Sequence, residues 1–182
     1  MTDRTGRRTE PVGAGVETDA AFAEFFAATW PRMFRTAVAI VGDAAAAEDC
    51  LQSAYARAYA SWRRVSSADH PEAYVRRMVV NEITSTRRHG WWRRERPSAT
   101  VEPAGAVPSP EADVVRHGVV WAAVQELPVR QRAVVVLRYY EDLSEQEIAA
   151  TLGCSRGTVK SQASAALANL RRYGALRDGA EA

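Results

Sequence analysis

The segment from Pro97 to Pro110 most constrains how this chain can fold. It holds four prolines among small residues and Glu102, and it contains no basic residue. Proline fixes one backbone dihedral and has no amide hydrogen, so such a segment continues neither a helix nor a sheet interior. Its composition is typical of an extended linker. We therefore expect two small domains, one on each side of residues 97–110.

The first domain is predicted to be helical. Between residues 20 and 41 apolar side chains recur with the 3.6-residue period of a helix, and we expect Pro31 to start a new helix or to kink this one. Asp43 suits the N-cap of the next helix. That helix ends before a polar loop, residues 63–68. An acidic cap with proline in the first turn then opens a third helix over residues 69–88.

The second domain is also predicted to be helical, although one segment favours a strand locally. A helix ends near Glu126, and the Leu127-Pro128 turn leads into another helix that runs to about Tyr140. This helix contains the consecutive residues 134–136, all valine, whose β-branched side chains favour strands. The apolar residues around them keep the helical period, so we predict a helix.

Residues 144–170 predict a helix-turn-helix. Ser144 and Glu147 form a capping box at the start of a short helix, Gly153 suits its end, and Ser155 caps a longer helix. This arrangement is typical of a DNA-binding motif, with a structural helical hairpin as the alternative. The longer helix is expected to bury one stripe, made of Val159, Ala163, Leu167 and Leu170.

The sequence therefore predicts an all-α fold of two small helical domains joined by a flexible linker, with the helix-turn-helix in the C-terminal domain. We place the domains at residues 19–96 and 111–176. Residues 1–18 and 177–182 are expected to be tails, and the first is expected to be disordered because it is polar and glycine-rich.

Charge is distributed unevenly along the chain, whose formal net charge is only +2. Residues 19–53 hold five acidic and two basic side chains, and residues 62–96 hold nine arginines and four acids. Residues 153–172 hold four basic side chains and no acid. An acidic surface favours a protein partner and basic surfaces favour a polyanion, whereas ordinary solvated helix faces are the alternative.

No enzymatic or metal chemistry is favoured. The three histidines are scattered, and Cys50 and Cys154 lack the spacing of a zinc site, so we predict no metal, no cofactor and no catalytic constellation. The start of the chain lacks the apolar region of an export signal, and no apolar run approaches the roughly 20 residues that span a bilayer. A cytoplasmic protein without membrane insertion is expected.

Several motifs resemble, in order along the chain, those of the extracytoplasmic-function (ECF) sigma factors of the sigma-70 superfamily, in particular a SigE-like subgroup. The resemblance covers about residues 20–173. In the second domain it rests on residues 126–128, 132–138, 143–149 and 153–161. In the first domain, residues 42–52 are similar to the polymerase-binding helix of that family, and residues 71–82 are similar to its promoter-melting helix.

The resemblance implies that the first domain binds core RNA polymerase and opens the −10 element of promoter DNA. It places Glu48, Asp49 and Gln52 on the polymerase contact; for the two acids, a favourable position near a helix N-terminus is the alternative. Asn81 matches a residue that lines a pocket for a flipped-out base, since an amide offers both a donor and an acceptor. The loop at residues 63–68 would complete this pocket. The neighbouring DNA contacts would be made by Arg76, Arg77, Thr84, Arg87 and Arg88.

The sequence leaves open the role of two tryptophans that follow this helix. Trp91 and Trp92 lie between arginines, a pattern suited to stacking on single-stranded bases, whereas packing at the end of the domain is the alternative.

For the second domain the resemblance implies recognition of the −35 element. Arg138, Glu145 and Gln146 match positions that support the recognition helix or touch DNA. The side chains offered to the groove are Arg156, Lys160, Ser161, Gln162 and Ser164. This chain has Ala165 and Ala166 where many relatives carry a basic residue, which puts one DNA contact in doubt.

The function predicted is that of an alternative sigma factor. Its partners would be core RNA polymerase, through the β′ and β subunits, promoter DNA and an anti-sigma factor. The alternative is a stand-alone helix-turn-helix repressor or activator, which would bind duplex DNA without polymerase. Such a protein would have no function for the polar face around Asn81.

Overall fold

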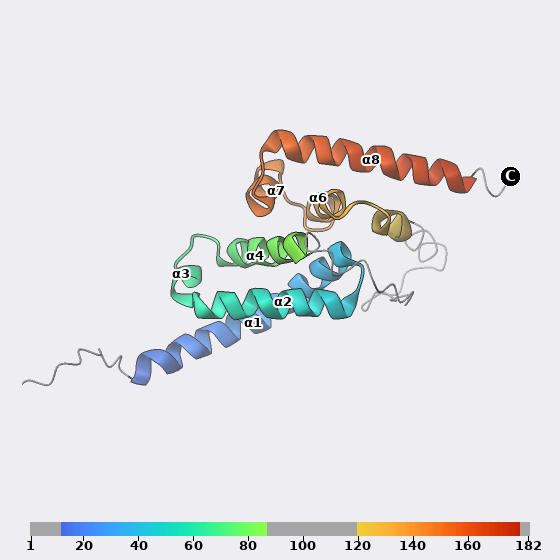
Figure 1. The fold of residues 1–182 in the computed structure, drawn as a ribbon. Coiled ribbons are helices and arrows are strands. Elements are labelled where there is room, and N and C mark those ends of the chain that lie inside the picture. The colour runs from blue at the N-terminus through green and yellow to red at the C-terminus, as the bar shows by residue number, and fades with distance from the viewer. Residues whose placement is uncertain (1–11, 87–119, 179–182) are drawn as a thin grey trace, which may run out of the picture.

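The computed structural model describes residues 12–86 and 120–178, and its regular structure in those ranges is entirely α-helical. The all-α prediction is thus confirmed there, and none of these helices is long and apolar enough to span a membrane. The linker predicted at residues 97–110 lies outside the described ranges. The elements are α1 (Val12–Val41), α2 (Ala44–Ala60), α3 (Trp62–Ser66), α4 (Pro71–Thr86), a helical segment at 120–125, α6 (Val129–Tyr139), α7 (Glu145–Leu152) and α8 (Arg156–Asp178) (Figure 1).

Helix α1 passes through Pro31 without interruption, so the expectation of a new helix there is wrong. Proline removes one backbone hydrogen bond, but Pro31 is exposed and the freed carbonyl can bond to water. Aromatic packing on α2 holds the turn that precedes this position. The ring centroids of Phe26 and Trp30 lie 5.1 and 5.4 Å from that of Tyr55.

Helix α1 also begins at Val12, inside the segment predicted to be a disordered tail. Residues far along the chain contact the turns that follow this segment. The Tyr59 hydroxyl donates to Asp19 at 2.6 Å, and the ring of Phe22 lies 5.0 Å from Tyr59 and 5.2 Å from Trp62. Burial of these rings anchors the helix just after the polar, glycine-rich segment, and adding further turns to a helix that is already formed costs less than starting one.

Helix α2 begins as predicted, because the Asp43 side chain accepts a hydrogen bond from the amide of Ala46 at 2.8 Å. The polar loop predicted after it is not entirely a loop. Its first part belongs to the short helix α3, which buries Trp62 and Val65. Two large apolar side chains three residues apart give this short segment one face that packs into the core.

The second domain contains the expected helices. Residues 134–136 lie within α6, which confirms the helical interpretation over local strand propensity. Val134, Val136 and Leu137 are buried there, so packing outweighs the cost of restricting β-branched side chains.

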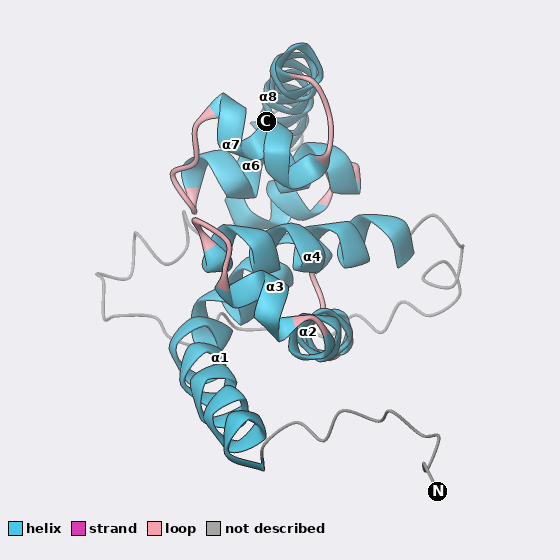
Figure 2. Cartoon of the chain, turned by 90° about the vertical axis from the view of Figure 1, so that its left-hand side faces the viewer, coloured by secondary structure: helices cyan, strands magenta, loops and turns pink. Residues whose placement is uncertain are grey.

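The two domains pack against each other: α4 contacts α7, and α1 contacts α6. In Figure 2 helices α6–α8 lie above α1–α4, and α8 is on the side opposite α2. Two side chains of the second domain reach the C-terminal end of α1. Arg132 donates to the carbonyls of Ile40 and Val41, at 3.1 and 3.2 Å, and Gln125 donates to that of Ala39 at 3.1 Å. A cation is favourable there because it meets free carbonyls and the negative end of the helix dipole.

Candidate nucleic-acid interface

The polar face predicted on α4 is present on the surface of the first domain. Arg77 and Asn81 are exposed and Thr84 is half-buried, while Val75, Val79, Val80 and Ile83 on the other side are buried. The Thr84 hydroxyl donates to the backbone carbonyl of Val80 at 2.9 Å. Arg77 and Asn81 are one helical turn apart, so a nucleic-acid strand lying along α4 could contact both.

Arg76 differs from the sequence expectation, because in this arrangement it does not lie on the exposed face. Only 8% of it is exposed, and its guanidinium pairs with Glu72 at 3.1 Å and with Glu141 at 3.7 Å. One residue is a step of about 100° around a helix, which moves Arg76 from the face of Arg77 toward α1 and the second domain. The other two predicted arginines, Arg87 and Arg88, and both Trp91 and Trp92 lie outside the described residues.

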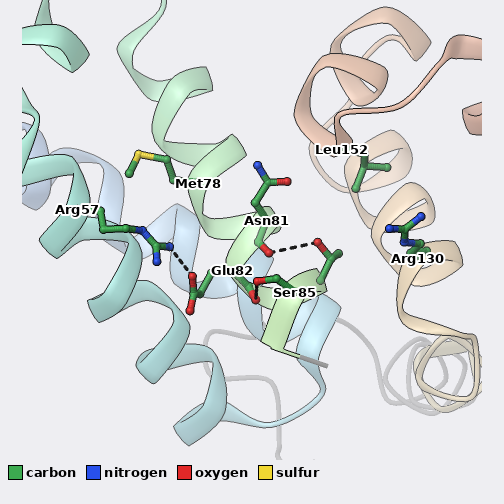
Figure 3. A pocket seen from close by; sticks show the side chains of 8 residues that line it. Arg57, Met78, Asn81, Glu82, Ser85, Arg130 and Leu152 are labelled. Atoms are coloured by element: carbon green, nitrogen blue, oxygen red, sulfur yellow. Dashed lines mark hydrogen bonds and ion pairs between the residues drawn. The ribbon is translucent and has the colours of Figure 1, made fainter. Parts of the chain in front are cut away.

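A groove of about 410 Å³ lies beside Asn81 (Figure 3). Helix α4 forms one wall with Met78, Asn81, Glu82, Thr84 and Ser85, and Arg57 of α2 pairs with Glu82 at one side. Figure 3 shows that the opposite wall comes from the second domain, through Arg130 and Leu152. The residue predicted to hold a flipped base therefore faces the other domain.

The acidic residues predicted to contact polymerase are exposed on α2. Glu48, Asp49 and Gln52 lie on the solvent side, and the Gln52 amide donates to Glu48 at 3.2 Å. The buried side of the same helix carries Cys50 and Leu51. Burial raises the pKa of the Cys50 thiol to about 11, with Glu82 and Asp49 adding to the effect and Arg57 opposing it, so this cysteine is a neutral core residue.

The helix-turn-helix has the predicted local chemistry. Both hydrogen bonds of the capping box are present: Ser144 accepts from the amide of Glu147, and the Glu147 carboxylate accepts from the amide of Ser144 at 2.8 Å. Gly153 ends α7 in the left-handed conformation, with φ of 62°. The Ser155 hydroxyl then accepts from the amide of Thr158 at 3.1 Å and caps α8. These contacts set where α7 begins and ends and where α8 begins.

The predicted DNA-reading side chains of α8 lie on its free surface. Arg156, Lys160, Ser161 and Ser164 are exposed, Gln162 is half-buried, and Gln146 of α7 is exposed. The half-buried carboxylate of Glu145 lies near three cations: Arg138 at 3.2 Å, Lys160 at 3.7 Å and Arg156 at 3.9 Å. These pairs bring the basic side chains together at the start of the recognition helix.

The buried stripe of α8 differs from the prediction at one position. Ala166 is fully buried, whereas Leu167 is 37% exposed. A seven-residue step from Val159 returns to within about 20° of the same face, but an eight-residue step misses it by about 80°. Ala166 packs inside the domain and Ala165 is half-buried, and the loss of a DNA contact at these positions stays a prediction.

Glu141 and Arg132 are two buried charged residues that sequence reasoning did not single out. Glu141 lies between a helix end and a turn, where an acidic side chain is ordinarily solvated, and Arg132 lies in a helix that holds two other arginines, Arg130 and Arg138. No local pattern distinguishes them, since the partners of Glu141 and two of the carbonyls that Arg132 bonds, those of Ile40 and Val41, are in the other domain.

Comparison with known proteins identifies the family to which this chain belongs. The model of sigma-70 region 2 matches residues 25–93, and the model of sigma-70 region 4 matches residues 117–170. The chain is 37% identical over 161 residues to the RNA polymerase sigma-E factor of Streptomyces antibioticus, with 86% of each covered. The chain belongs to the sigma-70 family.

Other relatives place this sigma-70 protein in the ECF group. It is 35% identical over 162 residues to the RNA polymerase sigma-E factor of Streptomyces coelicolor, covering 86% of this chain and 88% of the relative. It is 33% identical over 150 residues to the ECF RNA polymerase sigma factor SigE of Mycolicibacterium smegmatis, covering 78% and 57%. The first domain is therefore called region 2 below, and the second region 4.

The sigma-factor fold also has a solved counterpart. The sigma factor RpoE of Bartonella quintana, crystallised in complex with the anti-sigma factor NepR, superposes with a TM-score of 0.66 at 22% identity, covering 84% of this chain and 96% of the other. This likeness concerns the fold.

Proposed function

We propose that this chain is an alternative sigma factor that binds core RNA polymerase, directs it to a particular set of promoters and opens the DNA at their −10 element. One observation carries the proposal. Two exposed polar and basic surfaces, around Asn81 on α4 and Lys160 on α8, lie on the segments that match region 2 and region 4.

Region 2 would act on the single strand. The Asn81 amide can donate to and accept from the edge of a flipped base, and Arg77 one turn away can neutralise a backbone phosphate. Unstacking a base costs a few kcal/mol, which the pocket and the charge must offset together. No nucleotide hydrolysis is required for this step, because the binding energy of the captured strand drives it.

Polymerase binding would use the exposed side chains of Glu48, Asp49 and Gln52 on α2. Helix α2 lies on the side opposite α8 in Figure 2, so a partner seated on α2 leaves the recognition helix accessible. Two adjacent carboxylates suit a basic surface on the partner, and their exposure gives an association that weakens with salt.

Region 4 would read the −35 element as a duplex. Lys160, Ser161 and Ser164 lie on the free face of α8, where they can bond to base edges in the major groove. Arg156 near the helix start suits a phosphate. Because Glu145 pairs with both cations, it would hold them in position until DNA replaces it.

An anti-sigma factor is a further proposed partner, since the structurally similar RpoE was crystallised with one. The exposed surfaces of both regions would be the sites that such a partner covers.

The test is reconstitution of the full chain with core RNA polymerase and a library of genomic promoter fragments. The holoenzyme should yield sequence-selective transcripts, whereas the free chain should bind duplex promoters weakly. Tight, selective duplex binding by the free chain would instead favour a stand-alone repressor.

Two variants separate the proposed steps on a promoter found in this way. We expect Asn81→Ala to reduce permanganate reactivity of the −10 strand more than initial complex formation, and Lys160→Ala to reduce initial complex formation more than opening per complex. Each variant serves as the control for the other. Equal losses in both assays for both variants would contradict the division of roles.

A further inference from the structure

Glu145, the first residue of α7, places a carboxylate at the centre of an otherwise basic surface. Its side chain is 24% exposed and lies near three cations: Arg138 at the end of α6, and Arg156 and Lys160 at the start of α8. A negative charge weakens the attraction between a protein and DNA. Affinity for DNA therefore does not explain why this carboxylate lies beside the proposed DNA-reading side chains.

The two oxygens of the Glu145 carboxylate have different partners. Oε1 accepts a hydrogen bond from the Arg138 guanidinium at 3.2 Å. Oε2 lies 3.7 Å from the Lys160 ammonium and 3.9 Å from the Arg156 guanidinium, and both of these side chains are 64% exposed. These two distances exceed that of a charged hydrogen bond, about 2.7–2.9 Å. Arg138 thus anchors the carboxylate, which attracts the two α8 cations without occupying their hydrogens.

This arrangement leaves the donors of both α8 cations available to DNA. An ammonium group has three donors and a guanidinium group has five. Arg156 and Lys160 are one helical turn apart, so a single carboxylate attracts both of them toward the start of α7. In a helix-turn-helix the first helix crosses the DNA backbone while the second lies in the major groove. Both cations are therefore held where the groove and the backbone meet once α8 is seated on its site.

Glu145 affects promoter DNA and random duplex DNA differently. On the −35 element DNA takes over as the partner of the donors, but the two cations move little and keep much of their attraction to the carboxylate. Binding to random DNA consists essentially of cations reaching whichever phosphates are near, in no fixed register. A cation that leaves Glu145 for such a phosphate loses its ion pair. Each exposed pair of this kind changes an equilibrium constant by up to about fivefold.

We propose that Glu145 is a specificity-determining residue, which lowers the affinity of region 4 for random duplex DNA more than its affinity for the −35 element. This inference rests on the proposed function. It assigns part of the selectivity of promoter recognition to a carboxylate that restrains the cations of the recognition helix, in addition to the groove-facing donors themselves.

The test uses holoenzyme reconstituted from core RNA polymerase and the full chain, with Glu145→Gln as the variant. Glutamine removes the charge with little change of shape, and circular dichroism establishes that the helices are retained. Glu126→Gln is the matched control, because it removes the same charge from an exposed residue of region 4. Glu126 follows the helical segment at 120–125, which Figure 1 shows apart from α7.

Initial complex formation is measured on a promoter found with the genomic library and on the same fragment with its −35 element scrambled. Both fragments share one −10 element, so the ratio of the two affinities reports on region 4. Glu145→Gln should tighten binding to the scrambled fragment by about threefold or more and lower the ratio by a similar factor. Glu126→Gln should match the wild type. A gain of binding excludes a merely structural role, because a damaged domain binds less DNA.

The salt dependence and the pair with Lys160 provide two further measurements. On the scrambled fragment the log–log salt slope of Glu145→Gln should steepen by about 0.9 for each cation that gains a phosphate. In a Lys160→Ala background, Glu145→Gln should tighten binding to this fragment less than it does alone, since one of the two restrained cations is already absent. An equal effect in both backgrounds would overturn the assignment, because the carboxylate would then act through net charge alone.

An affinity ratio for Glu145→Gln that is unchanged or higher would also overturn the proposal, and so would an equal fall of the ratio in Glu126→Gln. If Glu145→Gln does not fold, Glu145→Ala decides by the same criteria, since alanine favours helices and also removes the charge. A wild-type holoenzyme that binds both fragments equally would contradict the proposed −35 recognition itself. A selective wild type with an equally selective variant contradicts only the role of Glu145.

Discussion

Replacing Arg132 by methionine removes a guanidinium that joins both domains but keeps most of the buried aliphatic stem. Arg132 is 4% exposed, and its guanidinium donates to the carbonyls of Ile40 and Val41 in region 2 and of Gln125 and Leu127 in region 4. Each hydrogen bond to a charged group contributes about 1.5–3 kcal/mol. Taken at face value, four of them would approach the total stability of a domain, about 5–15 kcal/mol.

The cost of burying the cation offsets much of that gain, so we expect Arg132→Met to lower the free energy of unfolding by about 3–5 kcal/mol. Urea denaturation followed by circular dichroism measures this effect. With a slope near 2 kcal/mol per molar urea, the midpoint should fall by about 2 M. Arg130→Met is the matched control, because Arg130 is on the same helix and exposed, and its substitution should change stability by less than about 0.5 kcal/mol. Equal midpoints for the two variants would refute the reasoning.

Three further predictions follow from the described residues. Ser144→Ala should lower the free energy of unfolding by about 1 kcal/mol at neutral pH. Hydrogen bonds from the Ser144 side chain, and then from its backbone, lower the pKa of Glu147, so the Glu147 contribution is present above the unfolded pKa and lost as pH falls through the folded one. The bond from the Glu147 amide to the Ser144 hydroxyl does not titrate, so melts at pH 7 and pH 3 should show a difference between variant and wild type that narrows in acid without vanishing. At pH 8 iodoacetamide should modify half-exposed Cys154 and spare Cys50, whose pKa burial raises to about 11; mass spectrometry that finds Cys50 modified first would contradict this. Lys160→Ala should make the salt dependence of promoter binding shallower by about 0.9 in log–log slope, measured by titration at several salt concentrations, and an unchanged slope would exclude a phosphate contact.

Much of the site was predictable because its signals are local. The capping box of Ser144 and Glu147 and the left-handed Gly153 are fixed by hydrogen bonds and dihedrals within a few residues, so their positions in the sequence predict α7 and its end. The exposure of Asn81 and Lys160 follows in the same way from helical period, since the apolar stripe of each helix determines which side is free.

Other features needed contacts between distant segments. Helix α1 extends back to Val12 from an anchor at Phe22, which packs against rings of α2 and α3, and the short helix α3 depends on a core that accepts Trp62 and Val65. Propensity over a few residues predicts a tail and a loop there, and burial of apolar surface outweighs it.

The sequence by itself determined the helices, the cap and turn of the helix-turn-helix and the exposed faces of α4 and α8, because each depends on periodicity and hydrogen bonds within a few residues. Only the tertiary structure decided that region 4 packs on region 2, that Glu141 meets Arg76 and that Arg132 meets the end of α1. The physical reason is that the desolvation and pairing of a charge depend on the surface opposite it, and that surface is brought there by packing rather than by neighbouring residues.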